Sequence, residues 1–134
     1  MKKCLAFIFT LIVALTATIS VYASNVSVFT NNTVDTKVSL GISSGTATAN
    51  VKCNALKSNF KSAKIDTKIQ KKVGIIWVTV DNGSWTETTK STKFAKAYSV
   101  KLSSKGTYRA HVKFTVSGTG GSDDEITKNV EKTY

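Results

Sequence analysis

Apolar and polar side chains alternate with a period of two along most of the chain after residue 33. This period places successive side chains on opposite faces of an extended segment and is typical of strands with one buried face. No segment shows a sustained period of 3.6, and Thr, Val and Ser stand where helix formers would be expected. The pattern predicts strands over residues 34–42, 46–56, 63–73, 75–80, 85–88, 94–102, 107–117 and 125–134. Seven or eight short strands joined by turns predict an antiparallel β-sandwich.

The sharpest turn signal is Asp81-Asn82-Gly83-Ser84. Asn-Gly supplies the two left-handed positions of a tight hairpin turn. We therefore expect residues 85–88 to fold back antiparallel on residues 75–80.

The first 23 residues have the parts of a cleavable signal peptide. Lys2 and Lys3 precede an apolar run over residues 5–19, and Val21-Tyr22-Ala23 places small residues before the expected cleavage after Ala23. An uncleaved anchor is the alternative, but threonines interrupt the run and it is shorter than the roughly 20 residues that a membrane span needs. We expect a secreted protein, extracellular or associated with the cell envelope, without a transmembrane span after processing.

Removal of the signal leaves an N-terminal segment, residues 24–33, whose order the pattern leaves open, and one domain over residues 34–134. The chain has 19 basic and 8 acidic residues, and loss of Lys2 and Lys3 leaves 17 basic residues and a net charge of +9. Such a charge attracts polyanions, which outside a cell include teichoic acids, acidic glycans and anionic lipid head groups. A basic surface that only keeps the protein soluble is the competing interpretation.

Cys53 is the one cysteine left after processing, so no intramolecular disulfide can form. It shares the inward side of its strand with alanines and a valine, which favours a buried structural thiol over a nucleophile. A nucleophile would need exposure and a basic neighbour.

Gly106-Thr107-Tyr108-Arg109-Ala110 resembles the G-x-Y-x-C entry into strand F of immunoglobulin domains. The resemblance implies that Tyr108 forms a tyrosine corner, that Ala110 takes the place of the second cysteine and that Cys53 takes the place of the first. A cysteine packed near an alanine would then replace the inter-sheet bridge. The interval from Cys53 to Trp77 is longer than in that family, so Trp77 is not assigned as the core tryptophan.

Over residues 45–134 the chain is similar to small secreted immunoglobulin-like proteins of Gram-positive bacteria. The likeness lies in a Gly-Thr-Ala opening, an Ile-Gln-Lys-Lys strand, a Trp-centred hairpin and a Lys-Gly-Thr-Tyr-Arg strand. It implies adhesion, wall binding or a purely structural role, and it does not choose among them.

No residue pattern predicts catalysis, a cofactor or a metal site. His111 is the one histidine and lies between Arg109 and Lys113, without a partner at ligand spacing. The three carboxylates at residues 123–125 follow a glycine-rich loop. They could bind calcium, but we expect them only to solvate that loop.

In an immunoglobulin-like sandwich the strands at residues 63–73 and 107–117 are neighbours, so their outward side chains share one face. The outward basic side chains are Lys64, Lys68, Arg109, His111 and Lys113. Their mutual repulsion must be relieved by water, Asp66 or a bound anion, which makes the face a candidate polyanion site. A lysine-rich face that merely deters edge-to-edge association is the alternative. We expect no specific nucleic acid, because no aromatic side chain interrupts these positions.

Two classes of function remain. The first is a non-enzymatic binding or structural module that associates with an anionic cell-wall polymer or glycan through the basic face. The second is a secreted cationic effector, such as a bacteriocin-like or membrane-active protein. The second would need an alternating β-hairpin to enter a bilayer, because no amphipathic helix is visible.

Overall fold

A computed structural model describes residues 31–134, which form seven antiparallel strands and no helix. The strands are β1 (Thr33–Ser43), β2 (Thr46–Ala55), β3 (Phe60–Val73), β4 (Ile76–Thr89), β5 (Lys93–Lys101), β6 (Thr107–Gly118) and β7 (Asp124–Thr133). The expected signal peptide, its cleavage site and residues 24–30 lie outside the described residues.

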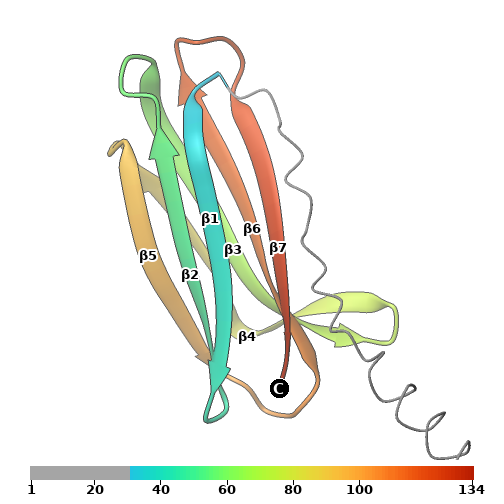
Figure 1. Cartoon of the computed structure of the whole chain (residues 1–134). Coiled ribbons are helices and arrows are strands. Elements are labelled where there is room, and N and C mark those ends of the chain that lie inside the picture. Colours follow the sequence, from blue (N-terminus) through green and yellow to red (C-terminus); the bar gives the residue numbers. More distant parts are fainter. Residues whose placement is uncertain (1–30) are drawn as a thin grey trace, which may run out of the picture.

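The strands form two packed sheets, with order β1-β2-β5 in one and β4-β3-β6-β7 in the other (Figure 1). The second strand therefore pairs with the fifth, and the third pairs with the sixth. These are the B–E and C–F pairings of an immunoglobulin-type sandwich, and β4 lies beside β3 instead of extending the first sheet. The predicted fold class, an all-β antiparallel sandwich without a disulfide, is confirmed.

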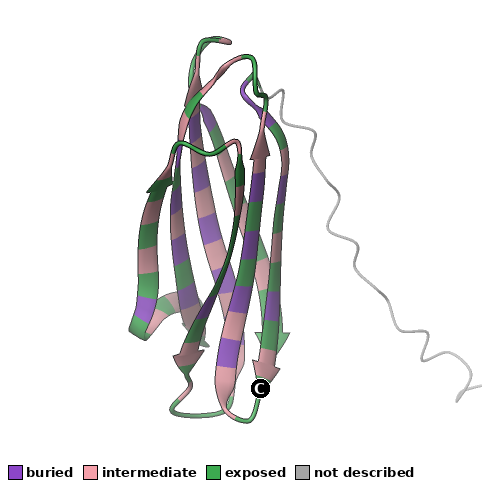
Figure 2. Cartoon of the chain, turned by 90° about the vertical axis from the view of Figure 1, so that its left-hand side faces the viewer, coloured by how far each residue is buried: buried purple, intermediate pink, exposed green. Residues whose placement is uncertain are grey.

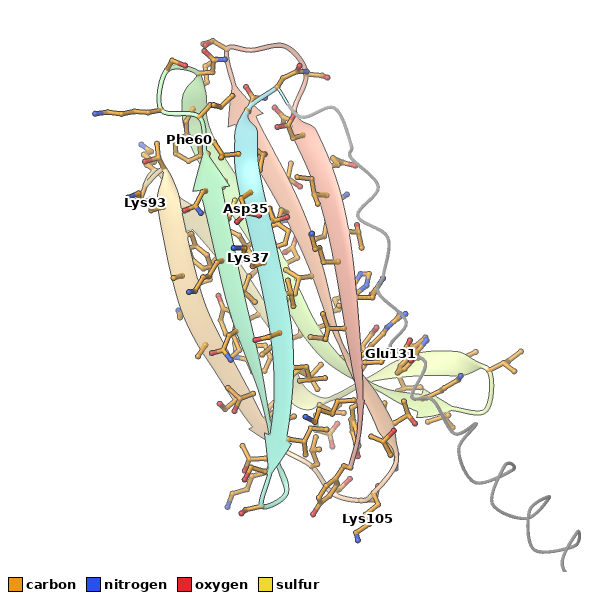
Figure 3. The ribbon with its side chains drawn as sticks, in the orientation of Figure 1. Asp35, Lys37, Phe60, Lys93, Lys105 and Glu131 are labelled. Carbon is orange, nitrogen blue, oxygen red and sulfur yellow. The ribbon has the colours of Figure 1, made fainter. Side chains whose placement is uncertain are left out.

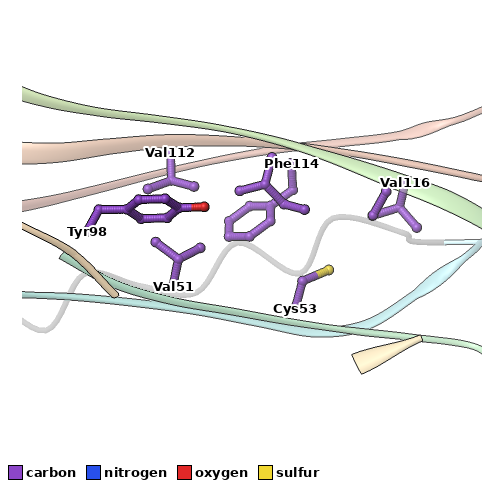
Figure 4. Packing of buried hydrophobic residues seen from close by; sticks show 8 residues of the cluster. Val51, Cys53, Tyr98, Val112, Phe114 and Val116 are labelled. Carbon is purple, nitrogen blue, oxygen red and sulfur yellow. The ribbon is translucent and has the colours of Figure 1, made fainter. Parts of the chain in front are cut away.

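Alternation of side chains builds the core between the sheets. Buried residues recur at every second position of β2 and β6, and the bands of burial are visible along the strands in Figure 2. One cluster includes Val51, Phe114 and Val116 (Figure 4), and a second includes Ala47, Ile69 and Ala110. The tryptophan that packs on both clusters is Trp85, whose ring stacks on Tyr98 with centroids 5.1 Å apart.

Tyr108 forms the expected tyrosine corner. Its side chain is 1% exposed, and its hydroxyl donates a 2.6 Å hydrogen bond to the carbonyl oxygen of Ser104, four residues upstream. This bond fixes the turn that leads from β5 into β6.

Cys53 and Ala110 are both buried, but they do not replace a disulfide as a packed pair. Cys53 lies in the cluster with Phe114 and Val116, whereas Ala110 lies in the other cluster with Ala47 and Ala49. Ala110 thus occupies the level of the β2 alanines, and the expectation of a cysteine–alanine contact is wrong.

The prediction of a hairpin turn at Asn82-Gly83 is also wrong, because β4 continues through these residues. The turn lies earlier, at Gly74-Ile75, where Val73 pairs with Ile76 and Gly74 has a φ of +63°. Glycine adopts this left-handed φ without steric cost, as a two-residue turn requires. The early turn lets β4 make ten register pairs with β3, whereas a turn at residues 82–83 would leave about five residues on each side to pair.

Asn82 and Gly83 instead form a large bulge. Lys68 pairs with Ser84 and Gln70 with Thr79, so residues 80–83 of β4 stand opposite Ile69 alone. Asn82 absorbs the extra length with a φ of +57°, a conformation that asparagine tolerates better than most residues.

The carboxylates at residues 123–125 do not all solvate their loop. Asp124 is 6% exposed and accepts hydrogen bonds from the backbone nitrogens of Asn31 and Asn32 and from the Thr33 hydroxyl, at 2.9, 2.7 and 2.8 Å. We call this set the Asp124 clamp. It fastens the chain ahead of β1 to the start of β7, and it places Asn31–Thr33, which precede the expected domain start, within the packed structure.

Candidate polyanion-binding face

The outer face of the β4-β3-β6-β7 sheet brings the predicted basic residues together. In the β3–β6 register Asp66 pairs with Lys113, Lys68 with His111, and Gln70 with Arg109. Lys64 lies one row further along, opposite Thr115. The five candidate residues therefore occupy neighbouring positions on two paired strands, as the alternation predicts.

Carboxylates neutralise one half of this face. Lys64 forms an ion pair with Asp66 at 3.3 Å, and Lys113 forms one with Glu125 on β7 at 3.0 Å. Burial raises the pKa of Asp66, but hydrogen bonds from Thr86 and Lys64 outweigh it and the pKa lies below its ordinary value. Asp66 therefore stays ionised at neutral pH. We call Lys64, Asp66, Lys113 and Glu125 the neutralised half.

The other half forms no direct ion pair in the described part of the chain, although the positive charge of Lys68 also helps to lower the pKa of Asp66. Among the ion pairs of residues 31–134, none includes Lys68 or Arg109. His111 lies beside both, and its Nδ1 is 2.7 Å from the amide oxygen of Asn129, so Nδ1–H donates there and Nε2 faces no such partner. Lys68, Arg109 and His111 are named the basic half. Two carboxylates stand beside this half: Glu131 is the register partner of Arg109 on β7, and Asp66 precedes Lys68 by two residues on β3.

Sequence reasoning missed Trp77 at the end of this face. The Arg109 guanidinium carbon lies 4.4 Å from the Trp77 ring centroid, while Arg109 Nε donates a 2.8 Å hydrogen bond to the Gln70 side-chain oxygen. A guanidinium held over an indole can still direct its remaining N–H groups to an anion. The sequence-based prediction placed the turn at Asn82-Gly83, so this contact was not expected. Trp77 lies opposite Lys72 of β3 because the turn is at Gly74.

Trp77 also removes the premise for expecting no nucleic acid. An aromatic ring does stand beside the basic positions, and aromatic rings beside a basic groove are a common element of single-strand binding, although Arg109 lies over one face of this ring. Comparison of oligo(dT) with teichoic acid as ligands of this face distinguishes the two classes of polymer.

Basic side chains outside this face are distributed over the rest of the surface. Lys93 and Lys105 lie at opposite ends of the molecule (Figure 3). Lys37 lies on β1 of the other sheet, where its Nζ is 3.5 Å from Asp35 Oδ2. Most lysines of residues 31–134 form no ion pair, so the net positive charge is general, and the basic half is distinguished by the register pair Lys68–His111 beside Arg109 on neighbouring strands.

Cys53 lies in the core between the sheets. Burial, assisted by the negative charge of Asp35, raises the pKa of the Cys53 thiol to about 11. Within residues 31–134 no three His, Cys, Asp or Glu side chains are grouped so that they could hold a metal ion. Nor does this part of the chain contain a helix with the length and apolar character to cross a membrane.

The fold and the face define an immunoglobulin-like β-sandwich with a half-neutralised basic sheet surface. Comparison of the chain with protein-family models, with curated proteins and with solved structures found no match.

Proposed function

We propose that this protein is a secreted, non-enzymatic binding module that associates with anionic polymers of the cell envelope through the basic half of its sheet face. The observation that carries the proposal is the row pair Lys68–His111 beside Arg109, with no ion pair on either Lys68 or Arg109. Phosphate or carboxylate groups of a polymer supply the charge that Asp66 and Glu125 supply elsewhere on the face.

A linear polyanion suits this geometry. Adjacent strands are about 4.8 Å apart, and alternate residues on a strand are about 7 Å apart, so the cations repeat along the face at a spacing that successive charged groups of an extended polymer can follow. The Arg109 guanidinium, oriented by Trp77 and Gln70, adds a fixed donor at the end of the row.

The test compares two double variants that remove equal charge from the same face. Lys68→Gln/Arg109→Gln empties the basic half, and Lys64→Gln/Lys113→Gln removes the two lysines of the neutralised half. Binding of poly(glycerol phosphate) teichoic acid is measured by titration calorimetry at low salt. We expect the first variant to bind about tenfold or more weakly than the wild type, since each lost charge-assisted hydrogen bond contributes about 1.5–3 kcal/mol. The second should bind within about threefold of the wild type.

Salt provides the second readout. Binding to teichoic acid should weaken steeply between low salt and about 0.5 M, where the screening length falls to a few ångströms. Equal losses in both variants would mean that net charge alone attracts the polymer, and salt-independent binding would contradict the charge argument. Tighter binding to oligo(dT) than to teichoic acid would mean that single-stranded nucleic acid, and not teichoic acid, is the ligand of this face.

A further inference from the structure

The β3–β4 hairpin carries its apolar side chains away from the core. Figure 1 shows the hairpin projecting from the side of the sandwich. At its tip Val73, Ile75, Ile76 and Val78 are 53, 95, 58 and 45% exposed. We call residues 71–78 the hairpin tip.

The exposed face of the tip continues the inward side of the sheet. Ile69 is fully buried, and Val73 lies on the same side of β3 two alternations further on. Ile76 pairs with Val73, and Val78 pairs with Lys71, so the apolar side of β4 extends in step. Unlike Ile69, these side chains are not covered by the opposite sheet, as their exposures show.

Cations stand at the base of the tip. Lys72 lies on the opposite side of the hairpin, 5.9 Å from the Trp77 ring centroid, and Arg109 lies over the same ring. Lys71 hydrogen-bonds to the Ser104 hydroxyl. The sequence between Asp66 and Asp81 contains no carboxylate. Behind the apolar end, Lys72 stands in one row with Trp77, Lys71 pairs with Val78 in the next row, and Arg109 lies over the indole with Glu131 as its register partner on β7.

We propose that the hairpin tip docks into the surface of an anionic lipid bilayer. The apolar residues enter the boundary between head groups and acyl chains, Trp77 lies at the interface, and Lys71, Lys72 and Arg109 contact lipid phosphates. From the Gly74-Ile75 turn to the Lys72–Trp77 row the hairpin is two residue steps deep, or about 7 Å. This matches the roughly 5–10 Å depth of interfacial elements and falls short of the roughly 9–11 residues per strand of a spanning hairpin.

Charge favours a bilayer over a second copy of the chain. The uncharged stretch Ile75–Val80 has the composition of an edge strand that could pair with another chain. Pairing two tips, however, would bring together the three cations of each copy on proteins that already carry a charge of +9 after processing. An anionic bilayer supplies both an apolar layer and opposite charge.

The test measures partitioning of the purified protein onto vesicles of phosphatidylglycerol and phosphatidylcholine, and onto phosphatidylcholine alone, by cosedimentation. Ile75→Ser/Ile76→Ser should lower the partition coefficient for the anionic vesicles at least about tenfold, because two isoleucines lose their burial. Val34→Ser/Leu56→Ser is the matched control, since Val34 and Leu56 are exposed apolar residues elsewhere. The control should stay within about twofold of the wild type.

Two further readouts locate the contact. In a Trp85→Phe background Trp77 is the remaining tryptophan, and its emission should shift to the blue on anionic vesicles and not on neutral ones. Lys72→Gln should weaken partitioning about fivefold. Unchanged partitioning of the isoleucine variant, equal partitioning onto neutral vesicles, or release of an encapsulated dye would each overturn peripheral docking. The proposal would also be overturned if the wild-type protein formed a dimer without binding vesicles and the isoleucine substitutions abolished that dimer.

This inference goes beyond the polymer-binding function and fails separately from it. The isoleucine variant keeps the basic half, so its teichoic acid binding should equal that of the wild type. Arg109 belongs to both surfaces and is kept in this variant, so loss of vesicle binding with retained polymer binding would assign vesicle docking to the apolar end of the hairpin and not to the basic half.

Discussion

At the residue scale, Asp124 joins the first and last strands of the domain. Its carboxylate accepts bonds from residues 92 and 93 positions earlier in the chain. Burial raises the pKa of this carboxyl, but the hydrogen bonds from Asn31, Asn32 and Thr33 outweigh burial, so the pKa lies below its usual value of 3.8. The ionised form is therefore the one that the folded state stabilises.

Asp124→Asn should lower the free energy of unfolding by about 1–3 kcal/mol at neutral pH, because it weakens a charged acceptor that serves several buried donors. Since the folded pKa is depressed, the wild-type advantage is present above the unfolded pKa of about 4 and is lost as pH falls through the folded pKa. Urea unfolding at pH 7 and below pH 4 measures both effects. Asp123→Asn, an exposed neighbour, is the control. A constant difference between wild type and Asp124→Asn across this range would contradict the account.

Cys53 is expected to be inert in the folded protein. With a pKa of about 11 and 3% exposure, only about one thiol in a thousand is ionised at pH 8, and that fraction is shielded by the sheets. Ellman's reagent should therefore label Cys53 in urea but not in the native protein within minutes, with Cys53→Ala as the blank. Rapid native labelling would mean that the sheets separate around the thiol.

At the scale of elements, β4 shows where local sequence signals lose to long-range pairing. Asn82-Gly83 and Gly74 both allow a turn, and the Asn-Gly pair is the stronger local signal. The number of register pairs with β3 decides between them, and that number depends on the partner strand. The Asn-Gly signal marks a real irregularity, which is a bulge and not a turn.

Gly83 should be the least replaceable residue of the bulge. A Cβ at this position would lie 2.4 Å from Val80 Cγ2 and 3.0 and 3.1 Å from the carbonyl oxygens of Val80 and Ile69. Gly83→Ala should therefore cost about 1–3 kcal/mol in the free energy of unfolding. Gly41→Ala in β1, where a Cβ meets nothing within 4 Å, should be neutral or slightly stabilising. Chemical denaturation of the pair decides, and equal stabilities would remove the steric argument.

At the scale of the whole molecule, side-chain alternation was sufficient to predict the architecture. The inward sets of β2 and β6 are the buried sets, and the tyrosine corner could be predicted from five residues around Tyr108. The candidate face followed from the same parity. Its division into two halves could not be predicted, because it depends on which β7 and β4 residues stand beside β6 and β3. The contact of Trp77 with Arg109 was hidden for the same reason.

The Asp124 clamp has a consequence for how the chain acquires its structure. The partners at residues 31–33 are made early, and the carboxylate that holds them is made more than ninety residues later. Contacts of such high sequence separation form late and slow folding. A nascent chain that ends before β7 therefore cannot form the Asp124 clamp. We expect it to remain extended and accessible until synthesis is nearly complete.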